Sequence, residues 1–271
     1  MSAITTSSDS RHDDHERAAY RRSWDNTWPV KLSEAKYLVL AYVAVVATGA
    51  LIGLAFTDWF APNAVTRMDD RVAQWWVDGR TDGLNSLAPW AAGTADTFIK
   101  IGISTVICLA LLWIFRRWDE AVYVALPLVF EAICFVTITH IVGRPRPDVE
   151  RLLESTINSS FPSGHVAAAT VYFAVVIVVW RHTGAVWARA LSLGLFVVVE
   201  IGVIWARMYQ GMHFLTDVIG GIVLGATSLL ITDRVLDTRR MGTLSDPGGA
   251  ADATSSPSSE AGARADRPSP Y

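Results

Sequence analysis

Six long apolar stretches constrain this chain more than any other feature of its sequence. They occupy residues 37–57, 97–115, 121–142, 163–180, 187–206 and 214–236, and 51% of the 271 residues are hydrophobic. A helix needs about 20 apolar residues to cross a bilayer core of roughly 30 Å, so each stretch suits a membrane span. Six strands are too few for a closed barrel in a chain of this length. The sequence therefore predicts an all-α integral membrane bundle of six transmembrane helices.

The apolar stretches also divide the chain. Residues 1–35 are polar and charged, which predicts a cytoplasmic N-terminal segment rather than a cleaved signal. Residues 36–236 form the six-span domain. Residues 237–271 are rich in Gly, Ala, Ser, Pro and Asp and carry few large apolar side chains, so we expect a disordered cytoplasmic tail.

Basic residues predict how the bundle is oriented. An even number of spans puts both termini on one side, and that side collects most of the basic residues: Arg17, Arg21, Arg22, Lys31, Lys36, Arg116, Arg117, Arg181, Arg189, Arg234, Arg239 and Arg240. The positive-inside rule then places both termini in the cytoplasm and the first, third and fifth connections outside the cell membrane. The net charge of −3 gives no indication of a nucleic-acid partner, and nothing in the sequence indicates an oligomeric state.

The first outer connection, residues 58–96, contains an amphipathic pattern. Val65, Met68, Val72, Trp75 and Trp76 recur at helical spacing with charged residues between them. This pattern predicts a helix that lies on the outer membrane interface. A helix packed over the mouth of the bundle is the alternative interpretation.

Three polar motifs fall on the predicted outer side. The first is Gly-Arg-Pro-Arg-Pro-Asp at residues 143–148, where Arg144 and Arg146 follow the third span. A guanidinium group binds phosphate in a bidentate manner, although basic flanks of spans are also common. The second is Phe-Pro-Ser-Gly-His at residues 161–165, before the fourth span. There Ser163 suits a helix cap, Gly164 permits close approach of a ligand, and a helix start attracts anions. An ordinary capped helix start with His165 at the interface is the alternative.

The third motif joins the last two spans and contains Arg207, His213 and Asp217. Four residues separate His213 from Asp217, which predicts neighbours on one helical face. The aspartate would then accept the imidazole N–H and increase the basicity of the other ring nitrogen. A local His–Asp pair without a catalytic role is the alternative.

The topology brings the three motifs to one end of the bundle. Arginines attract an anion and repel a metal cation, so we expect a phosphate site that needs neither metal nor cofactor. Glu131 lies near the middle of the third span and is expected to face the bundle interior, outside the site. Glu200 could support an arginine, and the two cysteines, Cys108 and Cys134, suit buried packing positions.

On these motifs the sequence resembles the type 2 phosphatidic acid phosphatase (PAP2) family, which shares its core with vanadium haloperoxidases. The matches are Arg146-Pro147, Pro162-Ser163-Gly164-His165 and Arg207-x5-His213-x3-Asp217, within residues 90–236. The sequence departs from the family pattern at two positions. Thr139 replaces the lysine and Ala206 replaces the serine before Arg207, so Arg144 is the candidate substitute for the lysine.

The resemblance implies a lipid phosphatase that acts at the extracytoplasmic face. His213 would be the nucleophile that forms a phosphohistidine, Asp217 would orient it, and His165 would act as acid and base. Arg146, Arg207, Ser163, Gly164 and Arg144 would bind the phosphate. The substrate would be a membrane lipid such as a polyprenyl diphosphate or phosphatidate. A lipid phosphotransferase with the same site, or a catalytically weak phospholipid-binding protein, remains an alternative.

Overall fold

The computed structural model describes residues 28–30, 32–59, 63–154 and 158–236. Six helices in this part of the chain are long and apolar enough to cross a membrane: Glu34–Asp58, Thr97–Phe115, Asp119–Val142, Gly164–His182, Val186–Tyr209 and Leu215–Val235. The predicted six-span helical bundle is therefore confirmed, with ends a few residues from the predicted ones. Residues 1–27 and the predicted tail at 237–271 lie outside the described residues.

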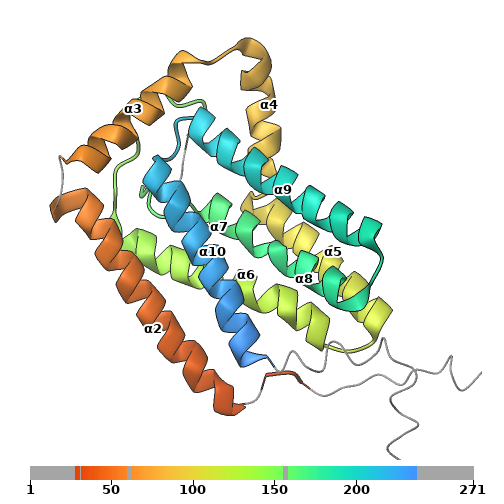
Figure 1. Cartoon of the computed structure of the whole chain (residues 1–271). Helices are drawn as coiled ribbons and strands as arrows, with labels where there is room; N and C mark the ends of the chain where they lie inside the picture. Colours follow the sequence, from red (N-terminus) through yellow and green to blue (C-terminus); the bar gives the residue numbers. More distant parts are fainter. Residues whose placement is uncertain (1–27, 31, 60–62, 155–157, 237–271) are drawn as a thin grey trace, which may run out of the picture.

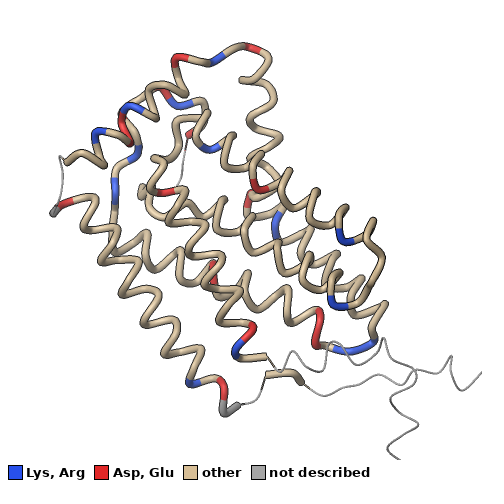
Figure 2. The backbone as a smooth tube through the Cα atoms, viewed as in Figure 1, with Lys and Arg blue, Asp and Glu red and all other residues tan. Residues whose placement is uncertain are grey.

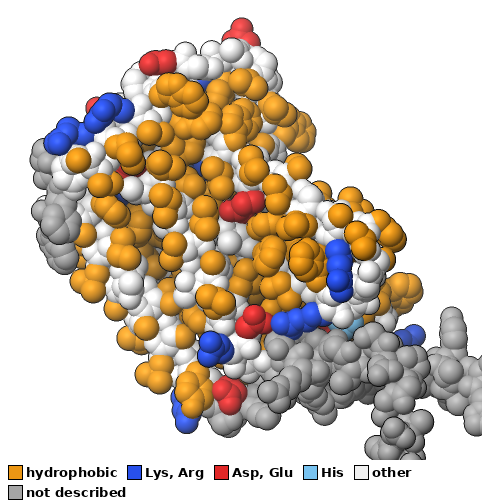
Figure 3. Space-filling view, viewed as in Figure 1, with side chains coloured by type: hydrophobic (Ala, Val, Ile, Leu, Met, Phe, Trp, Pro, Cys, Tyr) orange, Lys and Arg blue, Asp and Glu red, His pale blue; other side chains and the backbone are white. Residues whose placement is uncertain are grey.

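The helices form an elongated bundle with a helical cap at one end (Figure 1). In chain order they are α2 (Leu32–Leu54), the π-helical turn η1 (Ala55–Trp59), α3 (Ala64–Asp78), α4 (Asp82–Gly93), α5 (Thr97–Phe115), α6 (Asp119–Val142), α7 (Gly164–Val171), α8 (Phe173–His182), α9 (Val186–Tyr209) and α10 (Leu215–Val235). Helices α7 and α8 together make the fourth span. Helices α3 and α4 lie at the end opposite to the start of α2 and the end of α10. Hydrophobic side chains cover most of the face in Figure 3, as expected for a lipid-exposed surface.

Helix α7 lies at the centre of the bundle, where it packs closely against α10. A Cβ atom on Gly221 would lie 2.5 Å from the carbonyl oxygen of Ser163, and one on Gly225 would lie 2.6 Å from that of Ala167. Small residues at such contacts let helix backbones approach each other. This packing holds the start of α7 beside the start of α10, where two of the three motifs lie.

The end opposite to the cap is held by buried or half-buried ion pairs. Arg117 pairs with the fully buried Glu120, and Nε2 of His182 lies 3.0 Å from the same carboxylate. Arg181 donates to Asp233 at 3.1 Å. Both arginines belong to the set predicted to share the side of the termini, and Figure 2 shows charged residues at this end.

Helix α3 packs over the mouth of the bundle, where it contacts α9 and α10. Within α3, Asp69 and Ala73 are buried on the side that faces the bundle, whereas Val65, Met68 and Trp75 are exposed. The alternative interpretation, a helix packed over the mouth of the bundle, therefore holds, while contact of the exposed apolar side chains with the outer membrane interface stays a prediction. The reason for the packing is that Asp69 pairs with buried groups of the bundle, which periodicity alone does not reveal.

Candidate active site

The first motif begins where α6 ends. Gly143 adopts a positive φ of 58°, which favours glycine and ends the helix before the Arg-Pro-Arg-Pro run. The Arg146 guanidinium then crosses to the other motifs. Its Nη1 donates to the carbonyl oxygen of Met212, and its Nη2 donates to that of Ser159 at 3.3 Å. Arg146 is thus held between Met212 of the third motif and Ser159, which precedes the second motif, and its phosphate-binding role stays a prediction.

The second motif is a tight loop that leads into α7. The N–H of Ser163 donates to the carbonyl oxygen of Asp217 at 3.0 Å, which joins the loop to α10. Ser163 occupies the N-cap position of α7, but its side chain makes no capping hydrogen bond. The hydroxyl is buried and no hydrogen-bond partner for it is found among the described residues. A buried hydroxyl without a partner is costly, so this group is available to a ligand.

His213 lies in the loop before α10 and is 4% exposed. Its Nδ1 lies 2.8 Å from the carbonyl oxygen of Ser160 and 3.7 Å from the Asp217 carboxylate. The second distance exceeds hydrogen-bonding range, so the predicted His213–Asp217 hydrogen bond is wrong. Helix α10 begins only at Leu215, and the two residues therefore do not share a helical turn. Because a carbonyl oxygen only accepts, Nδ1 carries the proton and Nε2 is the free ring nitrogen.

Asp217 is fully buried and organises the start of α10 instead. Its Oδ2 accepts from the N–H of Phe214 at 2.9 Å, and its Oδ1 accepts from Nη1 of Arg144 at 2.6 Å. The Nη2 of Arg144 donates to Asp69 of α3 at 3.0 Å. Asp69 also accepts from the backbone and side chain of Thr216. These groups form a buried network that joins α3 to the start of α10.

The network corrects the prediction for Arg144. This arginine is 3% exposed, its guanidinium lies between two carboxylates, and it packs over the Phe214 ring at 4.4 Å. Both carboxylates compensate its charge, so Arg144 does not replace the missing lysine as a phosphate ligand. Thr139 does not replace it either, because its hydroxyl donates to the backbone of its own helix at 2.9 Å. Ala206, at the other departure, packs in an apolar cluster with Ala88 of α4.

Arg207 comes from the last turn of α9 and is 5% exposed. Its Nη1 donates to Oε1 of Gln210 at 3.2 Å, while its Nε has no hydrogen-bond partner among the described residues. A buried guanidinium N–H without an acceptor is available to an anion. Gln210 is fully buried and was not predicted from the sequence.

His165 lies one residue into α7 and points toward the start of α5. Its Nε2 lies 2.7 Å from Oδ1 of Asp96, a residue that the sequence motifs do not include. Arg207 and His213 are close enough to act electrostatically on His165. The predicted site residues therefore lie in one cluster at the capped end of the bundle, and Arg144 is joined to it through Asp217.

Burial and positive charge determine the protonation of the site. Burial, together with the charges of Arg207 and Arg146, lowers the pKa of His213 from its usual 6.5 to about 4, despite the opposing effect of Asp217. Burial also lowers the pKa of the Arg146 guanidinium. His213 is therefore neutral near pH 7 and can act as a nucleophile.

The two mid-span glutamates lie away from this cluster. Glu131 is fully buried and faces the bundle interior, as expected, with Nζ of Lys100 at 3.6 Å. Glu200 accepts from the Thr170 hydroxyl at 2.9 Å, so the proposed support of an arginine is not found. Both cysteines are free thiols, and only Cys134 is fully buried.

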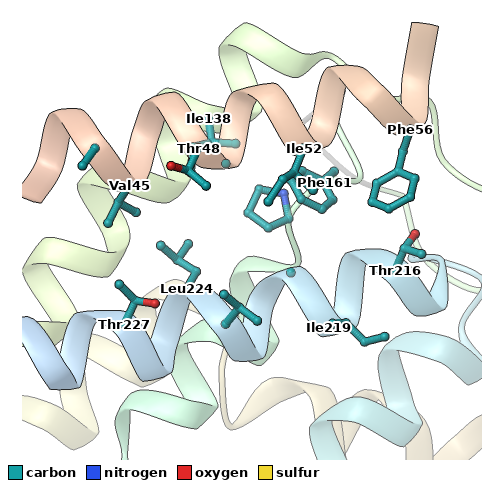
Figure 4. Close-up of a pocket in the computed structure, with 15 residues that line it drawn as sticks. Val45, Thr48, Ile52, Phe56, Ile138, Phe161, Thr216, Ile219, Leu224 and Thr227 are labelled. Atoms are coloured by element: carbon teal, nitrogen blue, oxygen red, sulfur yellow. The ribbon is translucent and has the colours of Figure 1, made fainter. Parts of the chain in front are cut away.

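An apolar groove of about 470 Å³ lies between α2 and α10 (Figure 4). Val45 and Ile52 line it from α2, Ile219 and Leu224 line it from α10, and Phe161 lies between them. Of the residues in the buried network, Thr216 reaches this groove, and none of the predicted catalytic side chains does. The groove therefore belongs to the apolar flank of the bundle rather than to the arginine-rich cluster.

The fold and this cluster together define a multi-pass membrane protein with arginine side chains gathered at one end of its bundle. Residues 120–241 match the model of the PAP2 superfamily. This segment contains all three motifs, and through it the chain resembles that superfamily.

Two curated relatives and one solved structure are similar to the chain. YbjG of Escherichia coli (strain K12), provisionally named an undecaprenyl-diphosphatase, is 28% identical over 151 residues, which cover 53% of this chain and 72% of the relative. Phosphatidylglycerophosphatase B of Bacillus subtilis (strain 168) is 26% identical over 169 residues, which cover 60% and 80%. The crystal structure of a transmembrane PAP2 type phosphatidylglycerolphosphate phosphatase from Bacillus subtilis superposes with a TM-score of 0.60 at 21% identity. That match covers 75% of this chain and 96% of the other, and it confirms the fold.

Proposed function

We propose that this chain is a membrane lipid phosphatase that hydrolyses a phosphate monoester or diphosphate through a phosphohistidine at His213. The observation that carries the proposal is the geometry of this histidine. Its Nδ1–H donates to the Ser160 carbonyl oxygen, which leaves Nε2 unprotonated beside Arg146 and Arg207. A neutral imidazole next to the half-buried guanidinium of Arg146 and the buried one of Arg207 suits attack on a bound phosphate.

The other groups have complementary roles in the proposed reaction. Arg146, Arg207, the Ser163 hydroxyl and the Gly164 N–H at the start of α7 bind the phosphate oxygens. Nε2 of His213 attacks phosphorus in line, and His165 protonates the leaving oxygen. His165 then removes a proton from the water that hydrolyses the phosphohistidine. These steps need no metal ion, because the arginines supply the positive charge.

The substrate and its location follow from the relatives' names and the charge distribution. An undecaprenyl or related polyprenyl diphosphate and phosphatidylglycerophosphate are the first substrates to test, with phosphatidate beside them. We place both termini in the cytoplasm and the site at the extracytoplasmic face of the cell membrane, because the basic residues gather at the other end.

Phosphate release by the purified protein in detergent with EDTA tests the reaction. We expect release from at least one of these lipids, complete loss in His213→Ala, and normal release in His140→Ala. His140 is the matched control because it is exposed and its one hydrogen bond among the described residues is to the backbone of its own helix. Release that EDTA abolishes would contradict the metal-free mechanism. Transfer of labelled phosphate to an added lipid acceptor rather than to water would favour a phosphotransferase.

A further inference from the structure

Asp96 contacts the predicted acid, His165, from outside the three motifs and outside the segment that matches the family model. The carboxylate oxygen Oδ1 lies 2.7 Å from Nε2 of the imidazole. Asp96 is also the N-cap residue of α5, a position where aspartate usually accepts from the helix amides. Here its side chain makes no such capping bond. The carboxylate is therefore directed to His165 rather than to its own helix.

The backbone at the α4–α5 junction holds the residue that carries this carboxylate, whose side chain is 56% exposed. The N–H of Asp96 donates to the carbonyl oxygen of Gly93. The carbonyl oxygen of Asp96 accepts from the backbone N–H of Lys100 at 2.7 Å. Ala95 is buried and packs with Val166 and Val203 of the bundle core. The turn that carries Asp96 is thus anchored on both sides to packed structure.

The contact determines which nitrogen of His165 can transfer a proton. A carboxylate only accepts, so Nε2 carries a hydrogen that it donates to Asp96. The other nitrogen, Nδ1, then exchanges the catalytic proton. Three charged or titratable groups act on this imidazole: Arg207 from α9, His213 from the loop before α10, and Asp96 from α5. Among these groups Asp96 carries the charge opposite to an imidazolium, and it lies in direct contact with Nε2.

We propose that Asp96 is a positioning residue that orients His165 and stabilises its protonated form. The inference rests on the proposed phosphatase function. As the bond between His213 Nε2 and phosphorus forms, the bond from phosphorus to the leaving oxygen breaks, and Nδ1–H of His165 passes its proton to that oxygen. His165 is left neutral, with the Nε2 hydrogen still donated to Asp96. In the second step Nδ1 takes a proton from water, whose oxygen displaces His213 from phosphorus.

The test compares leaving groups. General acid catalysis contributes about 10²–10⁴-fold, so we expect Asp96→Asn to lower kcat/KM for a lipid phosphate about 10–100-fold. For p-nitrophenyl phosphate the loss should be below about threefold, because a nitrophenolate leaves without protonation. In Asp96→Asn the basic limb of the plot of kcat/KM against pH for the lipid phosphate should move to lower pH. Asp96→Glu, which keeps the charge, should recover part of the activity.

Two comparisons separate positioning from a structural effect. Asp82→Asn is the matched control, because Asp82 is an exposed aspartate at the start of the neighbouring helix α4. In a His165→Ala background Asp96→Asn should have no further effect on kcat/KM, since both changes act on one group. Equal loss for both substrates, or full additivity with His165→Ala, would overturn the inference. An inactive wild-type protein would instead overturn the proposed function. If the wild type is active, His213→Ala is inactive and Asp96→Asn keeps full activity, this inference alone is overturned.

Discussion

Replacement of Asp69 by alanine tests whether α3 is held to the bundle by its buried network. Asp69 is fully buried and accepts from Arg144, from the Thr216 N–H at 3.2 Å and from the Thr216 hydroxyl. Removal of one partner from a buried ion pair typically costs about 3–5 kcal/mol. Arg144 retains Asp217 in the variant, so the cost should fall at the lower end. We therefore expect Asp69→Ala to lower the free energy of unfolding by about 3 kcal/mol.

Asp70→Ala is the matched control, because it makes the same chemical change one residue further along α3 at an exposed position. Exposed substitutions without special contacts usually change stability by about 0.5 kcal/mol or less. Equilibrium unfolding of both purified variants in mixed detergent micelles measures the difference. Thr216→Val should also cost less in the Asp69→Ala background than in the wild type, because its acceptor is then absent. Equal stability of the two aspartate variants would refute the docking of α3 through Asp69.

Three further predictions follow from the site and the helix packing. Ser163→Ala should leave the free energy of unfolding unchanged, because the hydroxyl has no hydrogen-bond partner in the described structure. The same change should lower kcat/KM about 10–100-fold, because a hydrogen bond to the charged phosphate is lost. Steady-state kinetics and equilibrium unfolding of one preparation measure both quantities. Because the pKa of His213 is lowered to about 4 in the folded chain, the unfolded chain binds more protons between about pH 4 and 6.5, so stability falls as the pH drops through this window. In His213→Gln the free energy of unfolding should fall less over this window than in the wild type, by up to about 3 kcal/mol. Identical pH dependence of stability in both proteins would contradict a buried neutral His213. Gly221→Ala should destabilise the bundle, because its Cβ would lie 2.5 Å from the Ser163 carbonyl oxygen, whereas Gly102→Ala, with no neighbour within 4 Å, should be neutral or slightly stabilising in thermal unfolding.

The helices and the reactive groups were predictable because each depends on local sequence. Apolar length alone indicates a span, and the six predicted stretches correspond to the six membrane helices. The motifs likewise bring His213, His165, Arg146 and Arg207 together, since their spans end on the same side. Sequence spacing was also enough to exclude Glu131 from the site.

Contacts between distant segments were not predictable in the same way. The spacing of His213 and Asp217 indicates a helical pair only if the helix includes both residues, and α10 begins between them. Arg144 and Arg146 lie two residues apart, and the sequence predicts that both bind phosphate, Arg144 as the substitute for the family lysine. Only the packing of α3 separates them, because Asp69 pairs with Arg144 and leaves Arg146 for the second and third motifs.

Two aspartates that precede the family segment therefore complete the arrangement of the site. Asp69 fixes Arg144 and, through it, the carboxylate of Asp217, while Asp96 contacts His165. Their sequence signals were weak for a physical reason. The sequence pattern places Asp69 on the polar face of an amphipathic helix, and it gives no sign that Asp96 differs from other polar residues before a span. An aspartate at either place becomes significant only when a buried cation or imidazole lies opposite it, so the segment before residue 120 contributes groups that the three motifs cannot supply.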